Sequence, residues 1–123
     1  LIGNADAHGK NFSLLYHGPK PVLAPAYDLL STAIYPDLSG KMAMKIGGKY
    51  KPRDVYLRHF HKLVPDTKAA QSAMNKQISA MVDKVNNKAR ALLAQMEREG
   101  IKSPVFEKVI AVIDERSARL TVN

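Results

Sequence analysis

The sequence contains no cysteine and no tryptophan among its 123 residues. Without cysteine, disulfides, thiolate zinc sites and cysteine nucleophiles are all excluded. No apolar run approaches the ~18 residues of a membrane-spanning helix, and no secretory signal pattern is present. The hydrophobic fraction of 46% is nevertheless large enough for a packed core. We therefore expect a folded cytoplasmic protein that does not enter a membrane.

Acidic residues are also scarce, because 11 Asp and Glu stand against 19 Lys and Arg, for a net charge of +8. Between positions 41 and 62 there are seven basic residues and one acid, Asp54. Such a patch attracts phosphates, acidic proteins or nucleic acid, although solvated lysines are an equally good explanation. Arg58 and Lys62 are the candidates for contacts with a DNA backbone.

Residues 1–53 have the pattern of loops and short strands. The segments FSLLY (12–16) and PVLAP (21–25) flank a Gly-Pro turn, which predicts a small β-hairpin. The segment KMAMKI (41–46) precedes two glycines and predicts a further short strand. None of these strands is long enough to form an independent sheet.

The pattern becomes helical over residues 54–123. Asp54 is a candidate N-cap for a helix that ends near Val64. Asp66 or Thr67 would begin the longest helix, and Gly100 is suited to end it. Along that helix, apolar residues recur every three or four positions and predict one buried face: Ala70, Met74, Ile78, Met81, Val85, Ala89, Leu92 and Met96.

The pair Ser103-Pro104 predicts the start of a last helix that extends to about Leu120, because serine is a good N-cap and proline suits the first helical position. Its expected buried face contains Val105, Val109, Val112 and Ile113. The fold class is therefore mainly α, with a short β-hairpin near the N-terminus. We expect one domain in two parts, residues 1–53 and residues 54–123.

The candidate chemistry lies in the first 28 residues. Asp6 and Asn11 are five apart, and a tight loop containing Gly9 would let both side chains face one small volume. This is the D-x-x-x-x-N spacing of a protein-kinase catalytic loop, in which the Asp is the base and the Asn binds magnesium. Kinases need a further acid after a short hairpin, and Asp28 follows the predicted hairpin. An amide and a carboxylate are a suitable protein share for Mg²⁺.

The fuller string carries a family resemblance. LIGNADAHGKNFSLL, then LAPAYDLLSTAIYP, then KMAMKIGG resembles the C-terminal part of HipA-like toxin kinases, the serine/threonine kinases of bacterial toxin–antitoxin pairs. The resemblance is dense over residues 1–48 and extends to RHF at 58–60. It implies the C-terminal lobe of a kinase-like fold. We therefore expect a fragment that begins inside a catalytic loop, with the upstream part of the kinase absent.

The resemblance also implies a role for each site residue. Asp6 would be the catalytic base, and Asn11 and Asp28 would bind Mg²⁺. His8, Gly9 and Lys10 would contact the ATP phosphates, together with Asn11 in a second role, and Tyr27 would lie against the nucleotide. Positive charge from the histidine and the lysine would stabilise the transferred phosphoryl group in its transition state.

The resemblance implies a protein serine or threonine as phosphoryl acceptor, with aminoacyl-tRNA synthetases as the associated substrate class, and a HipB-like DNA-binding antitoxin as partner. Two other functions stay open. A metal-dependent hydrolase would use Asp6, His8 and Asp28 to hold a metal and activate water. A helical binding module would contact DNA or a protein through the basic patch at 41–62.

Overall fold

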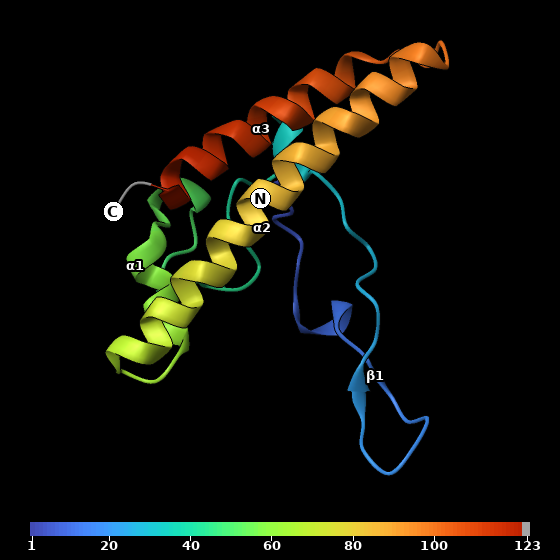
Figure 1. Ribbon diagram of the computed structural model, residues 1–123. Helices are drawn as coiled ribbons and strands as arrows, with labels where there is room; N and C mark the ends of the chain where they lie inside the picture. Colours follow the sequence, from blue (N-terminus) through green and yellow to red (C-terminus); the bar gives the residue numbers. More distant parts are fainter. Residues whose placement is uncertain (122–123) are drawn as a thin grey trace.

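A computed structural model describes residues 1–121, and two long helices dominate it. Helices α2 (Lys68–Arg98) and α3 (Pro104–Thr121) lie side by side and antiparallel, as Figure 1 shows. The short helix α1 (Leu57–Phe60) lies near the start of α2, and the N-terminal segment forms loops and a projecting two-stranded arm. The expectation of a mainly helical chain with an N-terminal hairpin is confirmed. Within residues 1–121, no helix has the length and apolar character needed to cross a bilayer.

The ends of the two long helices follow local sequence chemistry. The Thr67 hydroxyl accepts a hydrogen bond from the Ala70 N–H at 3.2 Å and caps the start of α2. At the other end Gly100 has a φ of +74°, and the Ile101 N–H reaches back to the Met96 carbonyl at 2.9 Å. This left-handed closure satisfies carbonyls that a helix end would otherwise leave unpaired. Ser103 then caps α3 through the Val105 N–H at 3.3 Å. These boundaries are confirmed.

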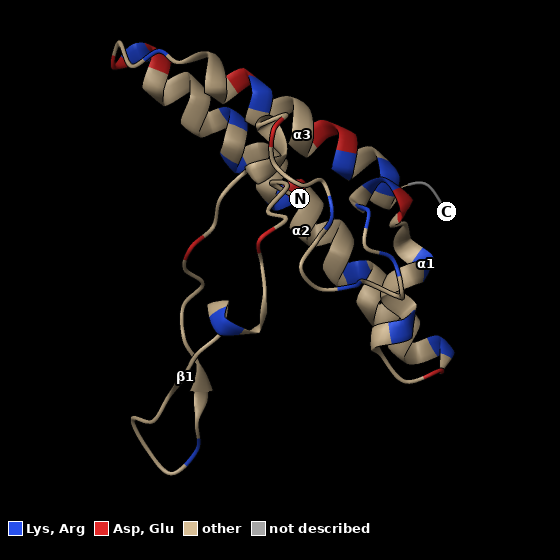
Figure 2. Ribbon diagram, turned by 180° about the vertical axis from the view of Figure 1, so that it is seen from behind, with Lys and Arg blue, Asp and Glu red and all other residues tan. Residues whose placement is uncertain are grey.

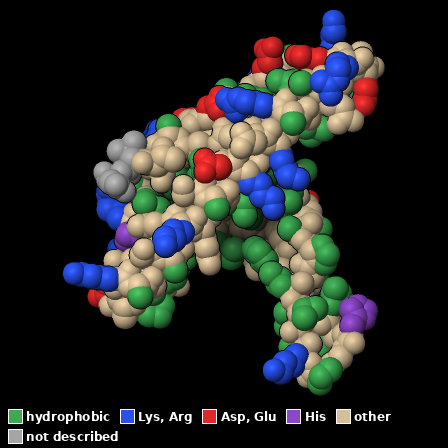
Figure 3. All heavy atoms as spheres, viewed as in Figure 1, with side chains coloured by type: hydrophobic (Ala, Val, Ile, Leu, Met, Phe, Trp, Pro, Cys, Tyr) green, Lys and Arg blue, Asp and Glu red, His purple; other side chains and the backbone are tan. Residues whose placement is uncertain are grey.

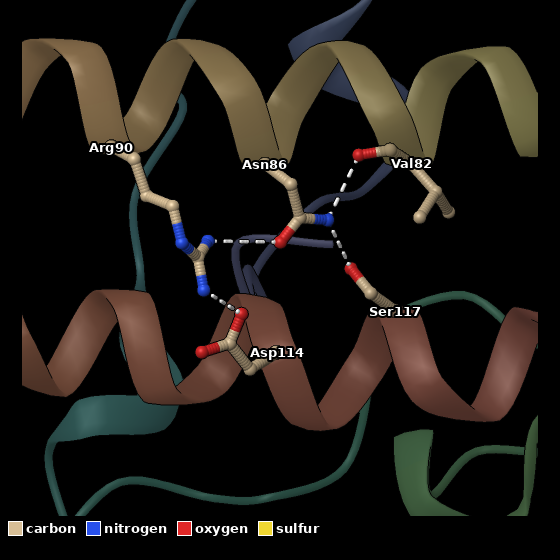
Figure 4. A network of polar contacts seen from close by, with 5 residues as sticks. All are labelled: Val82, Asn86, Arg90, Asp114 and Ser117. Carbon is tan, nitrogen blue, oxygen red and sulfur yellow. Dashed lines mark hydrogen bonds and ion pairs between the residues drawn. The ribbon is translucent and has the colours of Figure 1, made fainter.

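A polar network joins α2 to α3 (Figure 4). Asn86 Nδ2 donates to the Val82 carbonyl at 2.9 Å and to the buried Ser117 hydroxyl at 2.7 Å. One turn further along α2, Arg90 bonds the Asn86 side-chain oxygen at 3.1 Å and the Asp114 carboxylate at 2.7 Å. The two bonds that cross between the helices, to Ser117 and to Asp114, fix their register, because each requires one particular pair of turns to be adjacent.

The buried face of α2 differs from the expected stripe. Met81 is 54% exposed and Leu92 is 52% exposed, so the prediction that they are core residues is wrong. Val82, which was not in the stripe, is buried at 4% exposure. The reason is that α2 packs mainly on a single helix, which covers only a narrow line of its surface. Within residues 1–121 the buried hydrophobic residues are Val55, Val82 and Ile113.

The arm contains strands β1 (Leu14–Leu15) and β2 (Val22–Leu23), which pair antiparallel with Leu14 opposite Leu23. The predicted hairpin is therefore confirmed. Figure 3 shows hydrophobic side chains gathered along this arm. Several are more than half exposed: Phe12, Leu14, Tyr16, Val22 and Leu23.

Two other predicted elements are wrong. Residues 41–46 do not form a strand; the Met42 N–H bonds the Tyr50 carbonyl at 2.8 Å, whereas the Ala43 N–H bonds the Ala5 carbonyl at 2.8 Å. Ile46 forms an isolated antiparallel bridge with Lys49, but this pairing does not extend into a ladder. The helix expected to start at Asp54 is also broken. A 3₁₀ turn covers Pro52–Asp54, α1 starts after Tyr56, and a further 3₁₀ turn covers His61–Leu63.

A close contact joins the loop at 47–48 to α1. Gly47 has a φ of +55°, and a Cβ atom at this position would lie 2.4 Å from the backbone oxygen of His59. His59 is itself buried at 6% exposure, and its Nδ1 accepts the Tyr56 N–H at 2.9 Å. Glycine is therefore required here both by the backbone conformation and by the neighbouring chain.

Candidate functional site

The Thr32 hydroxyl bonds twice to the segment that carries Asp6. Thr32 Oγ1 accepts the Ala5 N–H at 2.8 Å and donates to the Gly3 carbonyl at 3.0 Å. The Ala33 N–H donates to the same carbonyl at 3.0 Å. Because these bonds join positions almost 30 residues apart, the loop at 3–6 is fixed to the segment that follows Asp28.

Gly3 allows this loop to approach α3. It has a φ of +80°, and a Cβ atom there would lie 2.6 Å from Ala33 Cβ and 2.8 Å from Val112 Cγ1. Any side chain would push the loop away from the helix. The glycine thus sets the distance between the candidate catalytic loop and the helical part of the chain.

Asn4 links the loop to the segment that contains Asp28. Its Nδ2 donates to the Asp28 carbonyl at 3.1 Å, and its Oδ1 accepts the Asp6 N–H at 3.0 Å. The second bond is the turn that asparagine commonly makes with the backbone two residues ahead. Asp6 is exposed, so its carboxylate can meet a substrate.

Asn11 makes the contact that closes the site. It ends the 3₁₀ turn Gly9–Asn11, where its Oδ1 accepts the His8 N–H at 2.9 Å. Its Nδ2 donates to Asp28 Oδ2 at 2.8 Å. The structure therefore brings together the two residues to which metal binding was assigned, although 17 positions separate them in the chain.

Asp28 has an unusual backbone. Its φ is +55°, in the left-handed region that residues other than glycine seldom adopt, although aspartate and asparagine tolerate it best. A conformation of this kind costs on the order of 1–3 kcal/mol and is concentrated at functional sites. Here the residue in this conformation is the one whose carboxylate accepts the Asn11 amide.

Tyr27 supports the loop from the side. Its hydroxyl donates to the Lys10 carbonyl at 2.9 Å and shares a 2.9 Å hydrogen bond with the Ser13 hydroxyl. The ring is 43% exposed, so part of it can still face a ligand. Gly9 and Lys10 lie exposed on the same turn. His8 is half-buried, and within residues 1–121 its Nδ1 atom is buried without a hydrogen-bond partner.

A cavity of about 100 Å³ lies between these groups, and Asn4, Asn11, Tyr27 and Asp28 line it. The residues fit a Mg²⁺ ion in type, since one carboxylate and one amide can complete a shell of phosphate oxygens and water. The Asn11 amide oxygen is engaged by His8, so it would have to leave that bond to reach a metal. Over residues 1–121, no three His, Cys, Asp or Glu side chains converge as a metal cluster, which the hydrolase alternative would need.

The two candidate nucleic-acid residues lie elsewhere. Arg58 is on α1 with its guanidinium 4.8 Å from the centre of the Tyr56 ring, and Lys62 is exposed on the following 3₁₀ turn. Basic residues mark this part of the ribbon in Figure 2.

The importance of Thr32 for the site could not be predicted from the sequence, because a single threonine between short elements belongs to no local pattern. The Asn4–Asp6 spacing, by contrast, is a recognisable turn motif.

Comparison with known proteins identifies the family. The family model of the HipA-like C-terminal domain matches residues 1–92. A Sinorhizobium fredii protein named "Putative kinase Y4mE" is 70% identical over 47 residues, which are 38% of this chain and 11% of that protein. The "Serine/threonine-protein kinase toxin HipA" of Shewanella oneidensis is 41% identical over 56 residues, 46% of this chain and 13% of the toxin.

A third relative aligns over most of the chain. "Putative kinase Y4dM" of Sinorhizobium fredii is 31% identical over 115 residues, which are 93% of this chain and 26% of that protein. The chain thus spans about a tenth to a quarter of the length of these relatives. No solved structure matches it significantly. The match to the family model covers most of the chain and includes the whole loop around Asn11 and Asp28, and the chain belongs to the family of HipA-like C-terminal domains.

Proposed function

We propose that the chain supplies the catalytic loop and the metal-binding acid of a HipA-like serine/threonine kinase, which transfers the γ-phosphoryl group of ATP to a protein hydroxyl. The observation that carries this proposal is the 2.8 Å bond from Asn11 to Asp28. It brings the end of a D-x-x-x-x-N loop onto an acid that follows a hairpin, which is the arrangement that phosphoryl transfer with Mg²⁺ uses.

In this proposal Asp6 accepts the proton of the attacking serine or threonine hydroxyl while the oxygen bonds to the γ-phosphorus and ADP leaves. The Asn4 bond to the Asp6 N–H fixes the backbone from which the carboxylate reaches the substrate. Such a base contributes typically ~10²–10⁴-fold to the rate. His8, Gly9 and Lys10 lie beside the phosphates, and the lysine adds positive charge where negative charge develops.

Asn11 and Asp28 would hold Mg²⁺, which when bound neutralises the charge of the β- and γ-phosphates. The carboxylate of Asp28 provides the charged oxygen, and the amide of Asn11 can turn from its two present partners toward the metal. Tyr27 keeps the turn closed through its bond to the Lys10 carbonyl and offers its exposed ring surface to the nucleotide.

The partners follow from the same proposal. The Shewanella relative is named a kinase toxin, so we infer a toxin–antitoxin context with a HipB-like antitoxin and a protein substrate, for which an aminoacyl-tRNA synthetase is the candidate. Contact with operator DNA is a second candidate role. The exposed Arg58 and Lys62, four positions apart next to α1, favour it because exposed cations can reach a phosphate backbone.

The deciding experiment is phosphoryl transfer from radiolabelled ATP by the full-length protein, in the presence of Mg²⁺ and a candidate protein acceptor. We expect label on serine or threonine, and its loss when Asp6 is replaced by Asn. Metal-dependent hydrolysis without ATP, combined with no transfer, would instead support the hydrolase alternative.

A further inference from the structure

A second cavity of the described chain lies away from the Asn11–Asp28 pair. It has a volume of about 590 Å³ and is bounded by the segment 31–41, the turn at 51–53 and one side of α3. Its size falls in the ~300–1,000 Å³ range of small-molecule sites. It shares no lining residue with the cavity next to Asp28.

The charged groups of this cavity are almost all basic. Lys41, Lys51, Arg53 and Arg116 line it, and Glu115 is the acid among the lining residues. The carboxylate of Glu115 already binds the Arg119 guanidinium at 2.9 Å, so its charge is largely compensated. Four cations therefore line one cavity with little negative charge to balance them, which gives the cavity a positive potential that attracts anions.

Arg116 is the central group. It lies half-buried on α3, and within residues 1–121 no hydrogen bond or ion pair reaches its side chain. Burial lowers the pKa of its guanidinium; Arg119 also lowers it, and Glu115 opposes the change. A guanidinium remains charged in proteins, so its five N–H donors are available to an acceptor that enters the cavity. That is a favourable position for an anionic acceptor, because a partly buried charge is screened less by solvent than a fully exposed one.

The charge and the walls limit the kind of anion. A carboxylate carries one negative charge, whereas a phosphate monoester carries about −1.5 to −2 and three acceptor oxygens, which suits several cations better. Arginine adds bidentate geometry that matches phosphate oxygens. The remaining walls include apolar groups, among them Leu38, Pro36 and Val112, which can contact the body to which a phosphate is attached.

We propose that this cavity binds a phosphate monoester, with Arg116 as the primary contact and Lys41, Lys51 and Arg53 around it. The ligand is either a free phosphorylated metabolite or a phosphorylated side chain of a protein, and both present the same group. The proposal is independent of the kinase function. Gly3, Ala5 and Thr32 also line the cavity, so a bound phosphate would lie against the backbone that carries Asp6.

The test is calorimetric titration of the full chain with inorganic phosphate and, separately, with a phosphoserine peptide. We expect Arg116→Gln to weaken binding about tenfold or more, the size of one lost charged hydrogen bond. Because Lys41 and Lys51 are exposed, their double replacement by Gln keeps the fold and should also weaken binding severalfold. The matched control is Lys76→Gln, on the exposed surface of α2 outside the cavity.

Comparing the two ligands shows whether the natural phosphate group belongs to a protein side chain or to a free metabolite. Tighter binding of the phosphopeptide than of inorganic phosphate, lost in the Arg116 variant, identifies a phosphorylated side chain; equal affinities identify a small free phosphate compound. Three results would overturn the proposal. The first is no binding of either ligand, and the second is unchanged affinity in both cavity variants. The third is a loss of phosphate affinity in Lys10→Gln but not in the cavity variants. The last would assign the phosphate to the loop next to Asp6.

Discussion

Asn11 Nδ2 and Asp28 Oδ2 lie 2.8 Å apart, and the other end of the Asn11 amide accepts the His8 N–H at 2.9 Å. The amide orientation follows from these two bonds, because a flipped side chain would place its NH₂ group against an N–H donor. Asn11 therefore acts as a link from the turn to the acid in this state. A metal at Asp28 would have to compete for that carboxylate and reorient the amide.

Replacing Asp28 by Asn removes the charge but preserves the local structure, since asparagine tolerates a positive φ and can still accept from Asn11. We expect Mg²⁺-dependent nucleotide binding by the full-length protein to weaken by about tenfold or more, because a neutral amide is a poor ligand for a hard dication. Calorimetry with ATP and Mg²⁺ measures this. Asp37→Asn, in an exposed loop, is the control. An unchanged affinity would exclude Asp28 as the metal ligand.

Replacing Asp6 by Asn should abolish transfer and leave nucleotide binding largely intact. The expected loss of turnover is ~10²–10⁴-fold, the contribution of a general base. Turnover of radiolabelled ATP and calorimetry are measured on the same samples, with Asp83→Asn on the exposed surface of α2 as control. Substantial transfer by the Asp6 variant would remove this residue from the base role.

Asn86→Ala should destabilise the helix pair by about 1–3 kcal/mol, because it leaves the buried Ser117 hydroxyl without its 2.7 Å partner. Arg90→Ala should cost less than about 1 kcal/mol, since its ion pair with Asp114 is about half exposed. Urea unfolding compares the two variants. If Asn86 and Ser117 are coupled, the double alanine variant should lose less than the sum of the single losses. Equal losses for Asn86→Ala and Arg90→Ala would contradict the role of the Asn86–Ser117 bond in holding the helices together.

His59 should make stability depend on pH. Its pKa is lowered by burial and by the nearby charge of Arg58, so the unfolded chain binds a proton more readily than the folded chain. The free energy of unfolding should therefore fall as the pH drops below about 6.5, with no such loss above it. Denaturant titrations at pH 7.5 and 5.5 measure the difference, which His59→Asn should reduce.

If Arg58 and Lys62 contact DNA, they touch phosphates and not bases. Changing both to Gln should then weaken binding of the antitoxin complex to every operator sequence alike. The slope of log affinity against log salt should decrease by about one unit for each lost contact. Fluorescence anisotropy over a salt series gives both quantities, and Lys76→Gln serves as control. A loss restricted to one sequence would argue against backbone contacts.

The helix ends could be predicted because each depends on a few neighbouring residues: Thr67 caps α2, Gly100 closes it, and Ser103 begins α3. The meeting of Asn11 and Asp28 was predictable from their spacing and the hairpin between them. The prediction of a strand at 41–46 was wrong because, unlike a helix cap, it depends on residues outside the segment. The amides of this segment bond to the carbonyls of Ala5 and Tyr50. Such partners cannot be recognised from a local pattern.

The buried face of α2 and the basic cavity likewise depend on distant parts of the chain, which a local sequence pattern does not show. Apolar spacing correctly predicted an amphipathic helix, but which line of it would be covered depended on the position of α3. Val82 was therefore missed and Met81 was wrongly placed. The residues next to Arg116 in the sequence do not indicate a cavity. The position of Arg116 beside Lys41 and Lys51 depends on how the loops return to α3.

The double role of the Thr32 hydroxyl has a consequence for exchange with solvent. The Ala5 amide is protected from deuterium only while that hydroxyl stays in place, because Thr32 Oγ1 is its acceptor. The amide of Ala33 reports on the same junction through its bond to the Gly3 carbonyl. These two amides should therefore exchange at matched rates, as one cooperative opening unit, whereas the amides of the projecting arm exchange independently of them.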